Sequence, residues 1–475
     1  MNSSDVLDIF RDITRIPRES GHEGPMTAFL VDFAKKHGLQ YKVDDVQNVC
    51  IIKEAAPGKE DVPTIVLQSH QDMVCEKTST STHDFLHDPI EYVIEDGWMI
   101  AKETTLGADD GIGIAASLAL LESDIPMGKI ECVFTISEET GMDGAEGMKE
   151  GFFTGKTLIN LDSEDDGQLF IGCAGGVNTT INFKYCKEKV SPAYKVLKIQ
   201  LGGAVGGHSG DDINKERMNV VQQLSRFLYD ELPFGLQLID FEAGGKPNAI
   251  ARDGFAVIAV PDAKATKERF EAFFRTVSDE YHTTEKSLFF DISDSCGYES
   301  AVDSKTAGKL IFSMFTCPHG VIAMSQDIPG LVETSTNLAS VHFVEGEKIK
   351  VVTSQRSSTD SEKKMIADKV EANFVLAGAE VEHLLPYPGW KPDVNSHILK
   401  ACIESYRKLF NAEPEVKAIH AGLECGLFLE KFHNLDMISF GPTLRSVHAP
   451  GERLELSTVD KFVDLLVDVV TNFKG

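Results

Sequence analysis

The feature that most constrains this chain is a series of apolar segments, each joined closely to histidine or to acidic residues. Three segments are short and apolar, with β-branched residues, which is typical of strands buried on both faces. A fourth is apolar on nearly every side and predicts a buried helix. The segments and their polar neighbours are residues 64–67 with His70 and Asp72, residues 112–121 with Asp109 and Asp110, residues 130–136 with Glu138 and Glu139, and residues 157–161 with Asp162.

Strands that alternate with helices in this way predict an α/β domain with a largely parallel central sheet. Ligands of such sheets bind beyond the carboxyl ends of the strands, where most of these polar residues fall. Each motif alone has a structural explanation, because a histidine can pair with an acid at a strand end, an aspartate can cap a helix, and glutamates can be solvated in a loop. A single helix cap, however, explains only one of Asp109 and Asp110. Four such segments in succession favour a shared site.

A metal centre is the chemistry that this combination of residues favours. Carboxylates with one or two imidazoles suit zinc, manganese or cobalt. A carboxylate-rich site commonly holds two ions about 3.5 to 4 Å apart with a bridging group. One more histidine would balance the second ion, and the candidates further along the chain are His208, His319, His420 and His448.

The length of 475 residues exceeds the roughly 100 to 200 residues of one domain, so at least two compact units are expected. From about Tyr194 the strand-like segments become longer and alternate with helical patterns. We therefore predict a second α/β unit inserted into the first. The predicted boundaries are 1–188 for the first segment of the catalytic domain, 189–390 for the inserted domain and 391–475 for the second catalytic segment.

Charge and cysteine usage argue against nucleic-acid-binding, membrane and disulfide-rich secreted proteins. Acidic residues number 74 against 46 basic ones, and a net charge of −28 would repel nucleic acid and anionic membranes. The amino terminus lacks the uninterrupted apolar core of a secretory signal, and no apolar stretch reaches the length of a membrane span. The nine cysteines include no CxxC pair, which argues against a disulfide framework and a thiolate zinc site. A cytoplasmic protein is expected, with no nucleic acid or membrane as partner.

Longer motifs resemble the M20 group of metallopeptidases, and most closely its aminoacyl-histidine dipeptidase branch, also called peptidase D. They occur in the family's order from His70 to Glu452, so the resemblance covers nearly the whole chain. The matching stretches are LQSHQDMV, TLGADDGIGIA, FTISEETGMDGA, LINLDSEDDG, GGHSGDDI, PNAIARD, HAGLECGLF and GPTLRSVHAPGE.

This resemblance implies a zinc-peptidase-like catalytic domain with an inserted α/β lid domain, and two Zn²⁺ per chain, with Mn²⁺ or Co²⁺ as alternatives. Asp109 would bridge the ions. Asp72 is similar to the acid that orients a histidine ligand, and Glu138 to the general base. The implied metal ligands are His70, Asp109 and Asp162 for one ion, and Asp109, Glu139 and His448 for the other.

The resemblance also implies substrate-binding residues. His208 matches a lid histidine that holds the substrate carbonyl, while Asn248 and Arg356 match lid positions that grip the terminal carboxylate. By charge complementarity, Glu424 is a candidate acceptor for the substrate's free amino group. The ordinary alternatives are structural roles, such as a turn histidine for His208 or a surface ion pair for Arg356.

The function that follows is hydrolysis of dipeptides, especially of the Xaa-His type, by attack of a metal-bridging water with Glu138 as general base. Within the same family, an N-acyl-amino-acid deacylase and a tripeptidase are alternatives. A noncatalytic metal-dependent peptide-binding protein is the alternative from another class, although binding alone needs no general base. The expected partner is a small peptide, and the insertion fits either a single chain or a homodimer.

Overall fold

The chain folds into two compact units. The computed structural model describes residues 1–475, apart from the side chain of Leu385. Among the helices of this described chain, none combines the length and the apolar character needed to cross a membrane. Unit 1 comprises Met1–Gly172, Trp390–Ala418 and Leu423–Gly475, and unit 2 comprises Cys173–Gly389 and Ile419–Gly422.

The first crossing between the units lies earlier than the predicted boundary at residue 188. The reason is the pairing of β9 (Gly175–Lys184), which is hydrogen-bonded to β20 (Lys348–Ser357) and β21 (Glu380–Tyr387) in the sheet of unit 2. The strand therefore belongs to the inserted unit, although the residue pattern shows no break between the last acidic motif and this strand. The return at Trp390 lies next to the predicted return at 391.

Unit 1 is built on an eight-stranded sheet whose central strands are parallel. β6, β3, β7 and β23 run parallel to one another, whereas β1 and β2 add antiparallel pairings at one side. In spatial order the strands are β1 (Gln40–Val43), β2 (Val49–Lys53), β6 (Ile130–Thr135), β3 (Ile65–His70), β7 (Thr157–Asn160), β23 (Asp436–Ser439), β8 (Gln168–Cys173) and β22 (Glu415–Ile419).

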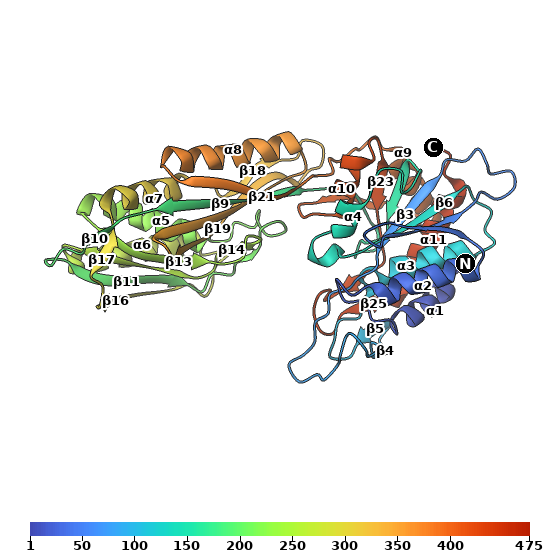
Figure 1. The fold of residues 1–475 in the computed structure, drawn as a ribbon, viewed down its shortest axis with the longest axis horizontal. Coiled ribbons are helices and arrows are strands. Elements are labelled where there is room, and N and C mark those ends of the chain that lie inside the picture. The colour runs from blue at the N-terminus through green and yellow to red at the C-terminus, as the bar shows by residue number, and fades with distance from the viewer. The chain divides into compact units, whose positions relative to one another are not determined.

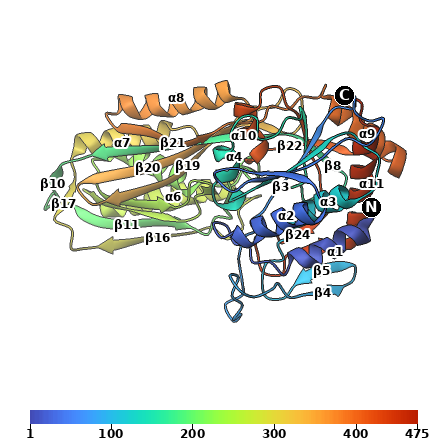
Figure 2. The same cartoon turned by 45° about the vertical axis from the view of Figure 1, so that its right-hand side comes forward.

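The central strands form because their residues are apolar and covered on both faces. Every residue of β3, β6 and β7 is buried, and so is α3 (Ala108–Glu122) from its first residue to Leu121. In Figures 1 and 2, α1, α2 and α3 lie together on one side of β3. The remaining helices of unit 1 are α1 (Ser3–Ile13), α2 (Gly24–Lys36), η1 (Glu138–Thr140), α4 (Asp143–Gly147), α9 (His397–Phe410), α10 (Glu424–Lys431) and α11 (Leu456–Asn472).

A small antiparallel sheet joins distant parts of unit 1. Its strands are, in order, β24 (Leu444–Arg445), β25 (Arg453–Glu455), β5 (Trp98–Ala101) and β4 (Tyr92–Glu95). Because β24 and β25 flank His448, this sheet anchors the His448 loop beside the first third of the chain.

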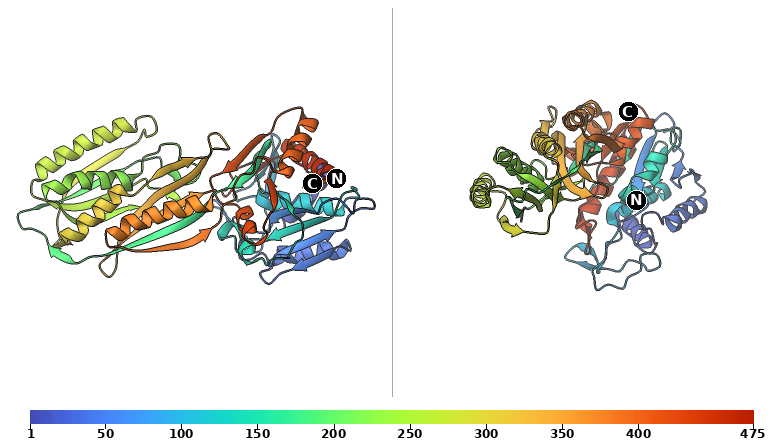
Figure 3. Two further views of the ribbon diagram at one scale, coloured as in Figure 1. Left: turned by 90° about the horizontal axis from the view of Figure 1, so that it is seen from above. Right: turned by 60° about the vertical axis from the view of Figure 1, so that its left-hand side comes forward.

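Unit 2 contains a nine-stranded sheet with four helices packed on one face. The helices α5, α6, α7 and α8 lie side by side over the strands in Figure 3, and a continuous apolar core fills the space between helices and sheet. The strands are β16 (Phe289–Ser295), β11 (Lys195–Gly202), β15 (Gly254–Val260), β13 (Gln237–Gly244), β19 (Val332–Val344), β20, β9 and β21, with β18 (Gly320–Met324) paired to β19. The helices are α5 (Val220–Glu231), η2 (Leu232–Phe234), α6 (Ala263–Glu280), α7 (Ser304–Thr316) and α8 (Asp360–Leu376).

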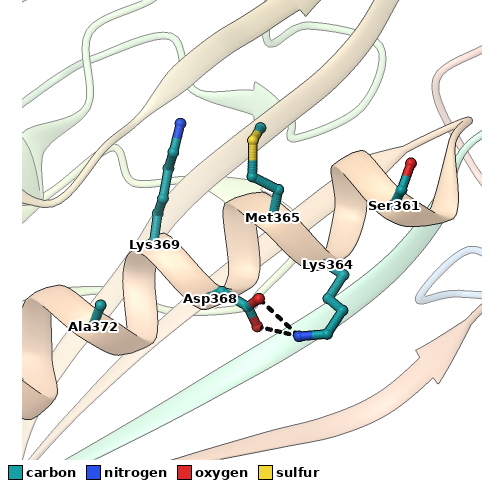
Figure 4. A pocket seen from close by; sticks show the side chains of 6 residues that line it. All are labelled: Ser361, Lys364, Met365, Asp368, Lys369 and Ala372. Atoms are coloured by element: carbon teal, nitrogen blue, oxygen red, sulfur yellow. Dashed lines mark hydrogen bonds and ion pairs between the residues drawn. The ribbon is translucent and has the colours of Figure 1, made fainter.

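Two short strand pairs complete unit 2. β10 (Lys187–Lys189) pairs with β17 (Ser300–Val302), and β12 (Gly207–His208) pairs with β14 (Ala249–Ile250). A surface hollow on α8 carries an exposed ion pair, in which Lys364 Nζ lies 2.7 Å from each oxygen of Asp368 (Figure 4). Such pairs four residues apart stabilise a helix by about 0.2 to 0.5 kcal/mol.

Candidate metal centre

Three of the acidic motifs meet because they follow neighbouring parallel strands. His70 is the last residue of β3, Glu138 and Glu139 follow β6, and Asp162 follows β7. The strand order β6-β3-β7 places these carboxyl ends at one edge of the sheet. The arrangement matches the rule that ligand sites of open sheets form at this edge.

Asp109 lies at the middle of the cluster, with one carboxylate oxygen toward each of two histidines. Oδ1 is 3.0 Å from His70 Nε2, and Oδ2 is 3.0 Å from His448 Nε2. Asp162 Oδ1 lies 3.3 Å from the same nitrogen of His70, and Glu139 Oε2 lies 3.0 Å from the same nitrogen of His448. The structure thus brings the five predicted ligands together in two triads that share Asp109.

The second aspartate of the motif has a different environment. Asp110 Oδ1 accepts a hydrogen bond of 3.1 Å from the backbone N–H of Gly113, the usual bond of a helix cap. The backbone of Asp109 and Asp110 is not yet helical, so the regular helix starts after them. One aspartate therefore caps the helix, which leaves Asp109 for the cluster.

The donor set and its spacing fit divalent cations. Within each of the triads His70, Asp109, Asp162 and Asp109, Glu139, His448, one ligand atom per residue lies within 4.8 Å of the others. Ligands about 2.0 to 2.2 Å from a tetrahedral zinc ion are separated by roughly 3.3 Å. The measured separations of 3.0 to 3.3 Å are close to that value. Two ions that share Asp109 therefore match the residues present.

The electrostatics of the cluster also favour positive charge. Hydrogen bonds that His448 donates to Asp109 and Glu139 raise the pKa of His448 to about 11, against the opposing effect of burial. Burial raises the pKa of Asp162 well above its ordinary value, and Asp109 raises it further. Bound cations would favour the ionised form of Asp162 and would let both histidines act as neutral ligands.

Asp72 links His70 to the glutamate motif. Its Oδ1 lies 3.3 Å from His70 Nδ1 and also accepts the backbone N–H of Glu138, at 3.1 Å. Its Oδ2 accepts the N–H of Glu139 at 3.2 Å and the hydroxyl of Ser20 at 2.8 Å. Burial opposes ionisation, but these donors and His70 lower the pKa of Asp72 to about 2. One buried carboxylate therefore lies beside the imidazole of His70 and accepts two backbone N–H groups of the adjacent loop.

Glu138 lies beside the cluster and belongs to a third group of potential ligand atoms, with His70 and Glu139. Burial raises the pKa of its carboxyl well above the ordinary value. His70 opposes this shift, while the carboxylates of Glu424, Glu139 and Asp109 add to it. A buried carboxyl with a raised pKa that adjoins such a cluster is a candidate for proton transfer.

Glu424 is a buried carboxyl with one unpartnered oxygen. Its Oε2 accepts hydrogen bonds from Gln68 Nε2 at 2.6 Å and Thr135 Oγ1 at 2.8 Å, whereas the buried Oε1 has no hydrogen-bond partner among the described residues. Burial raises the pKa of Glu424 to about 7. A donor such as an ammonium group would satisfy the unpaired oxygen.

The three predicted lid residues lie in unit 2. His208 on β12 pairs with Ala249, so the segments of His208 and Asn248 are neighbours, and the Asn248 carbonyl accepts the N–H of Ser209 at 2.8 Å. Arg356 on β20 donates from Nη1 to the Tyr387 hydroxyl at 3.0 Å, and its buried Nε has no hydrogen-bond partner among the described residues. That buried donor is available to an anionic ligand.

The other histidines considered as ligands have structural environments in unit 2. His319 Nδ1 accepts the N–H of Leu338 at 3.2 Å, and His420 Nε2 is 2.7 Å from the hydroxyl of Ser335. Neither belongs to the groups of ligand atoms found in the described chain. His448 is therefore the candidate that the fold brings to the cluster.

Two buried charged residues were not assigned a role from the sequence. The Arg18 guanidinium is 2% exposed and donates to the backbone carbonyls of Gln71, Asp72 and Gly107. The Glu452 carboxylate, also 2% exposed, accepts backbone N–H groups from the loop that carries Asp109. Glu452 lies inside a recognised motif, GPTLRSVHAPGE, but nothing in the sequence around Arg18 signals its contacts.

Comparison with known proteins gives one family and near-complete relatives. The model of peptidase family M20/M25/M40 matches residues 66–472. The cytosol non-specific dipeptidase of Escherichia coli (strain K12) is 37% identical over 469 residues, which cover 98% of this chain and 96% of that protein.

Solved structures agree in fold over the whole chain. Aminoacylhistidine dipeptidase from Vibrio alginolyticus matches with a TM-score of 0.92 and 36% identity, over 98% of this chain and 96% of that one. The aminopeptidase PepT from Bacillus cereus matches with a TM-score of 0.58 and 16% identity, over 99% and 98% of the two chains, which supports the fold alone. The predicted α/β fold class is confirmed, with a mixed central sheet in unit 1 that is parallel at its centre.

Proposed function

The chain belongs to peptidase family M20/M25/M40, and from this premise we propose that it is a metallo-dipeptidase that works with a pair of divalent cations. The observation that carries the proposal is the position of Asp109, whose two carboxylate oxygens each lie 3.0 Å from a different histidine. Glu138 lies beside the same cluster and is a candidate for proton transfer, which hydrolysis requires and binding alone does not.

We assign the two triads to two ions, with zinc as the first choice and manganese or cobalt as alternatives. His70, Asp109 and Asp162 would hold one ion, and Asp109, Glu139 and His448 the other. When bound, the cations would supply Lewis-acid activation of the attacking water and of the scissile carbonyl. Asp72 would keep the ring of His70 in the orientation that directs Nε2 to its ion.

Glu138 would carry the proton in the hydrolytic step. Its carboxylate takes a proton from the attacking water as the new C–O bond forms at the peptide carbonyl. It then delivers the proton to the leaving nitrogen as the C–N bond breaks, so the products are a free carboxylic acid and a free amine. The raised pKa of the buried Glu138 suits the first transfer, because a stronger base takes the proton more readily.

Dipeptides are the proposed substrate class, and Xaa-His dipeptides the first to test. The names of the two near-complete relatives support this, since one is a non-specific dipeptidase and the other an aminoacylhistidine dipeptidase. Within unit 1, the unpartnered oxygen of Glu424 suits the free amino group of a dipeptide. In unit 2, we assign His208 to the substrate carbonyl, and Asn248 and Arg356 to the terminal carboxylate, on the basis of the family motifs.

The cellular setting of the proposal is the cytoplasm, where small peptides are the partners. Its support is the set of nine scattered cysteines without a CxxC pair, which suits a reducing compartment, and the cytosolic location stated in the name of the relative from Escherichia coli. A single chain and a homodimer both fit the proposal, and size measurement in solution separates them.

A substrate panel with defined metals tests the function. The protein is treated with a chelator, reloaded with zinc, manganese or cobalt one at a time, and assayed on Xaa-His dipeptides, other dipeptides, tripeptides and N-acyl amino acids. The proposal predicts that turnover disappears with the chelator, returns with metal and is highest on dipeptides. Turnover of N-acyl amino acids alone would replace the proposal by a deacylase, and turnover of tripeptides alone by a tripeptidase.

A further inference from the structure

Both oxygens of the buried Glu452 carboxylate accept hydrogen bonds from the backbone of the Asp109 loop, residues 106–109. Oε2 accepts the N–H groups of Leu106 at 2.7 Å and Gly107 at 3.0 Å. Oε1 accepts the N–H groups of Ala108 at 2.8 Å and Asp109 at 3.4 Å. All four donors come from consecutive residues, so the loop wraps around a single carboxylate.

These donors lie in the turn that leads into the regular part of α3. The backbone N–H groups of such a turn have no partner within the helix, and a negative charge is favoured near a helix start. Gly107, at the cap position, has φ of +68° and no capping side chain. A Cβ at Gly107 would lie 2.5 Å from the Arg18 guanidinium, so glycine is required for this close approach. Glu452 therefore satisfies donors that the loop itself cannot.

The other end of the connection is the His448 loop, whose backbone is strained. Ser446 and His448 have φ of +56° and +60°, in the left-handed region that residues other than glycine rarely adopt. Such conformations cost about 1 to 3 kcal/mol each and persist when the surroundings fix them. Glu452 lies four positions after His448, and its N–H donates to the Ala449 carbonyl at 3.1 Å. The bonds of its side chain thus tie a strained loop to the Asp109 loop.

We propose that Glu452 is a positioning residue that sets the separation between Asp109 and His448, and thereby the affinity for the ion that these two residues share. Glu452 acts on Asp109 through the backbone, because its side chain accepts hydrogen bonds from the N–H groups of the Asp109 loop. The inference rests on the proposed function, because it concerns the second of the two proposed ions. Glu452 would be needed for that ion and much less for the first.

Glu452 should matter more for the second ion because the ligands of the two ions differ in how firmly the fold supports them. His70 ends a buried strand that is paired on both sides, with β6 and β7, and Asp162 follows one of those partners. The Asp109 loop has further support from Arg18, which donates to the Gly107 carbonyl. His448, by contrast, projects from a loop with a side chain that is 49% exposed. Removal of Glu452 therefore affects His448 most.

The test is metal binding to the full-length protein, measured apart from activity. Metal-free parent and Glu452→Gln are titrated with Co²⁺, and uptake is followed by the absorption spectrum of the bound ion. In this variant an NH2 group replaces one carboxylate oxygen, so a donor faces the N–H donors of the loop. Partners that orient metal ligands typically change affinity by about 10 to 100-fold. We expect Glu452→Gln to retain one ion at the parent's affinity and to bind the other at least about tenfold more weakly.

Two reference variants identify what has been lost. His448→Ala removes the ligand itself, and its one-ion spectrum should coincide with that of Glu452→Gln. Glu131→Gln is the matched control, because Glu131 is also a fully buried carboxylate that accepts backbone N–H groups, from Thr154 at 2.6 Å and Gly155 at 2.9 Å. It lies on β6 near its start, whereas Glu138 and Glu139 follow the end of that strand. Both affinities should be unchanged in Glu131→Gln.

The outcomes separate the inference from the proposed function. Parent-like binding of both ions by Glu452→Gln, or a parallel loss of both affinities, would overturn the positioning role. Failure of the parent to bind two ions would overturn the proposed function and the inference with it. Should Glu452→Gln not fold, Glu452→Asp takes its place, because it keeps the charge and shortens the reach by one methylene. The same selective loss of one ion is then required.

Discussion

Asp109 and His448 are separated by 339 positions in the chain, yet Oδ2 of the aspartate lies 3.0 Å from Nε2 of the histidine. The other oxygen of Asp109 lies 3.0 Å from His70. One carboxylate thus joins a residue of the central sheet to a residue of the last loop. Under the proposed function, this shared position is what allows the cluster to hold two ions.

Replacement of Glu138 by Gln should abolish turnover and leave metal content nearly unchanged. The amide keeps the size of the side chain but cannot accept the proton, and general acid–base catalysis typically contributes about 10² to 10⁴-fold. The measurement is kcat on an Xaa-His dipeptide together with metal analysis of the purified variant.

Glu139→Gln is the matched control for that variant, because the neighbouring glutamate lies 3.0 Å from His448 and is assigned to an ion. It should lose metal as well as activity. If Glu138→Gln lost metal to the same extent, Glu138 would be a ligand or a folding residue instead of the general base.

Replacement of Asp72 by Asn should weaken metal binding by about 10 to 100-fold, the usual effect of removing a partner that orients a ligand. Asp72 contacts His70 and also accepts the N–H groups of Glu138 and Glu139, so kcat should fall even at saturating metal. Calorimetric titration with zinc gives the affinity. Ser20→Ala, which removes only the hydroxyl donor to Asp72, should have a much smaller effect, and equal effects would contradict this account.

Replacement of Glu424 by Gln should raise KM for dipeptides by about 10 to 100-fold, since a hydrogen bond to a charged group contributes about 1.5 to 3 kcal/mol. Its buried Oε1 lacks a partner among the described residues, so a substrate ammonium group is the proposed one. The informative comparison is KM for a dipeptide against Ki for the same compound with an acetylated amino group. Equal losses for both compounds would show that Glu424 does not bind the amine.

Acid should destabilise the protein in part through His319. Burial lowers the pKa of His319 to about 4, from an ordinary value of 6.5. Nδ1 accepts from Leu338 N and lies 3.4 Å from Asn219 Nδ2, so protonation would place a donor against donors. The folded state binds fewer protons than the unfolded state between these two pKa values. The contribution of His319 to stability is therefore complete above pH 6.5 and is lost as the pH falls toward 4, with a loss of about 2 kcal/mol at pH 5.

Urea unfolding of the parent and of His319→Asn at pH 7 and pH 5 measures this effect. Asparagine retains an oxygen acceptor but does not titrate, so the variant should lose less stability between the two pH values than the parent. The same pH dependence in both proteins would exclude His319 as the titrating group.

Much of unit 1 could be predicted because its signals are local. The buried strands, the buried helix α3 and the acids at their ends follow from apolar runs and the residues that punctuate them, and parallel strands bring such ends to one edge. Periodicity does not specify the contacts that depend on the whole fold. Glu452 accepts hydrogen bonds from four backbone N–H groups, and Arg18 donates to three backbone carbonyls. These bonds join segments far apart in the chain. The first crossing between the units differs from the predicted boundary for a related reason, since β9 is assigned to unit 2 by its partner strands and not by its own residues.

The central claim is that two ions share Asp109, and anomalous diffraction from crystals of the metal-loaded protein tests it most directly. Data collected at the absorption edge of the bound metal should show two peaks about 3.5 to 4 Å apart, one on each side of the Asp109 carboxylate. The peak near His70 and Asp162 and the peak near Glu139 and His448 should both disappear in Asp109→Ala. A single peak, or two peaks away from Asp109, would contradict the account.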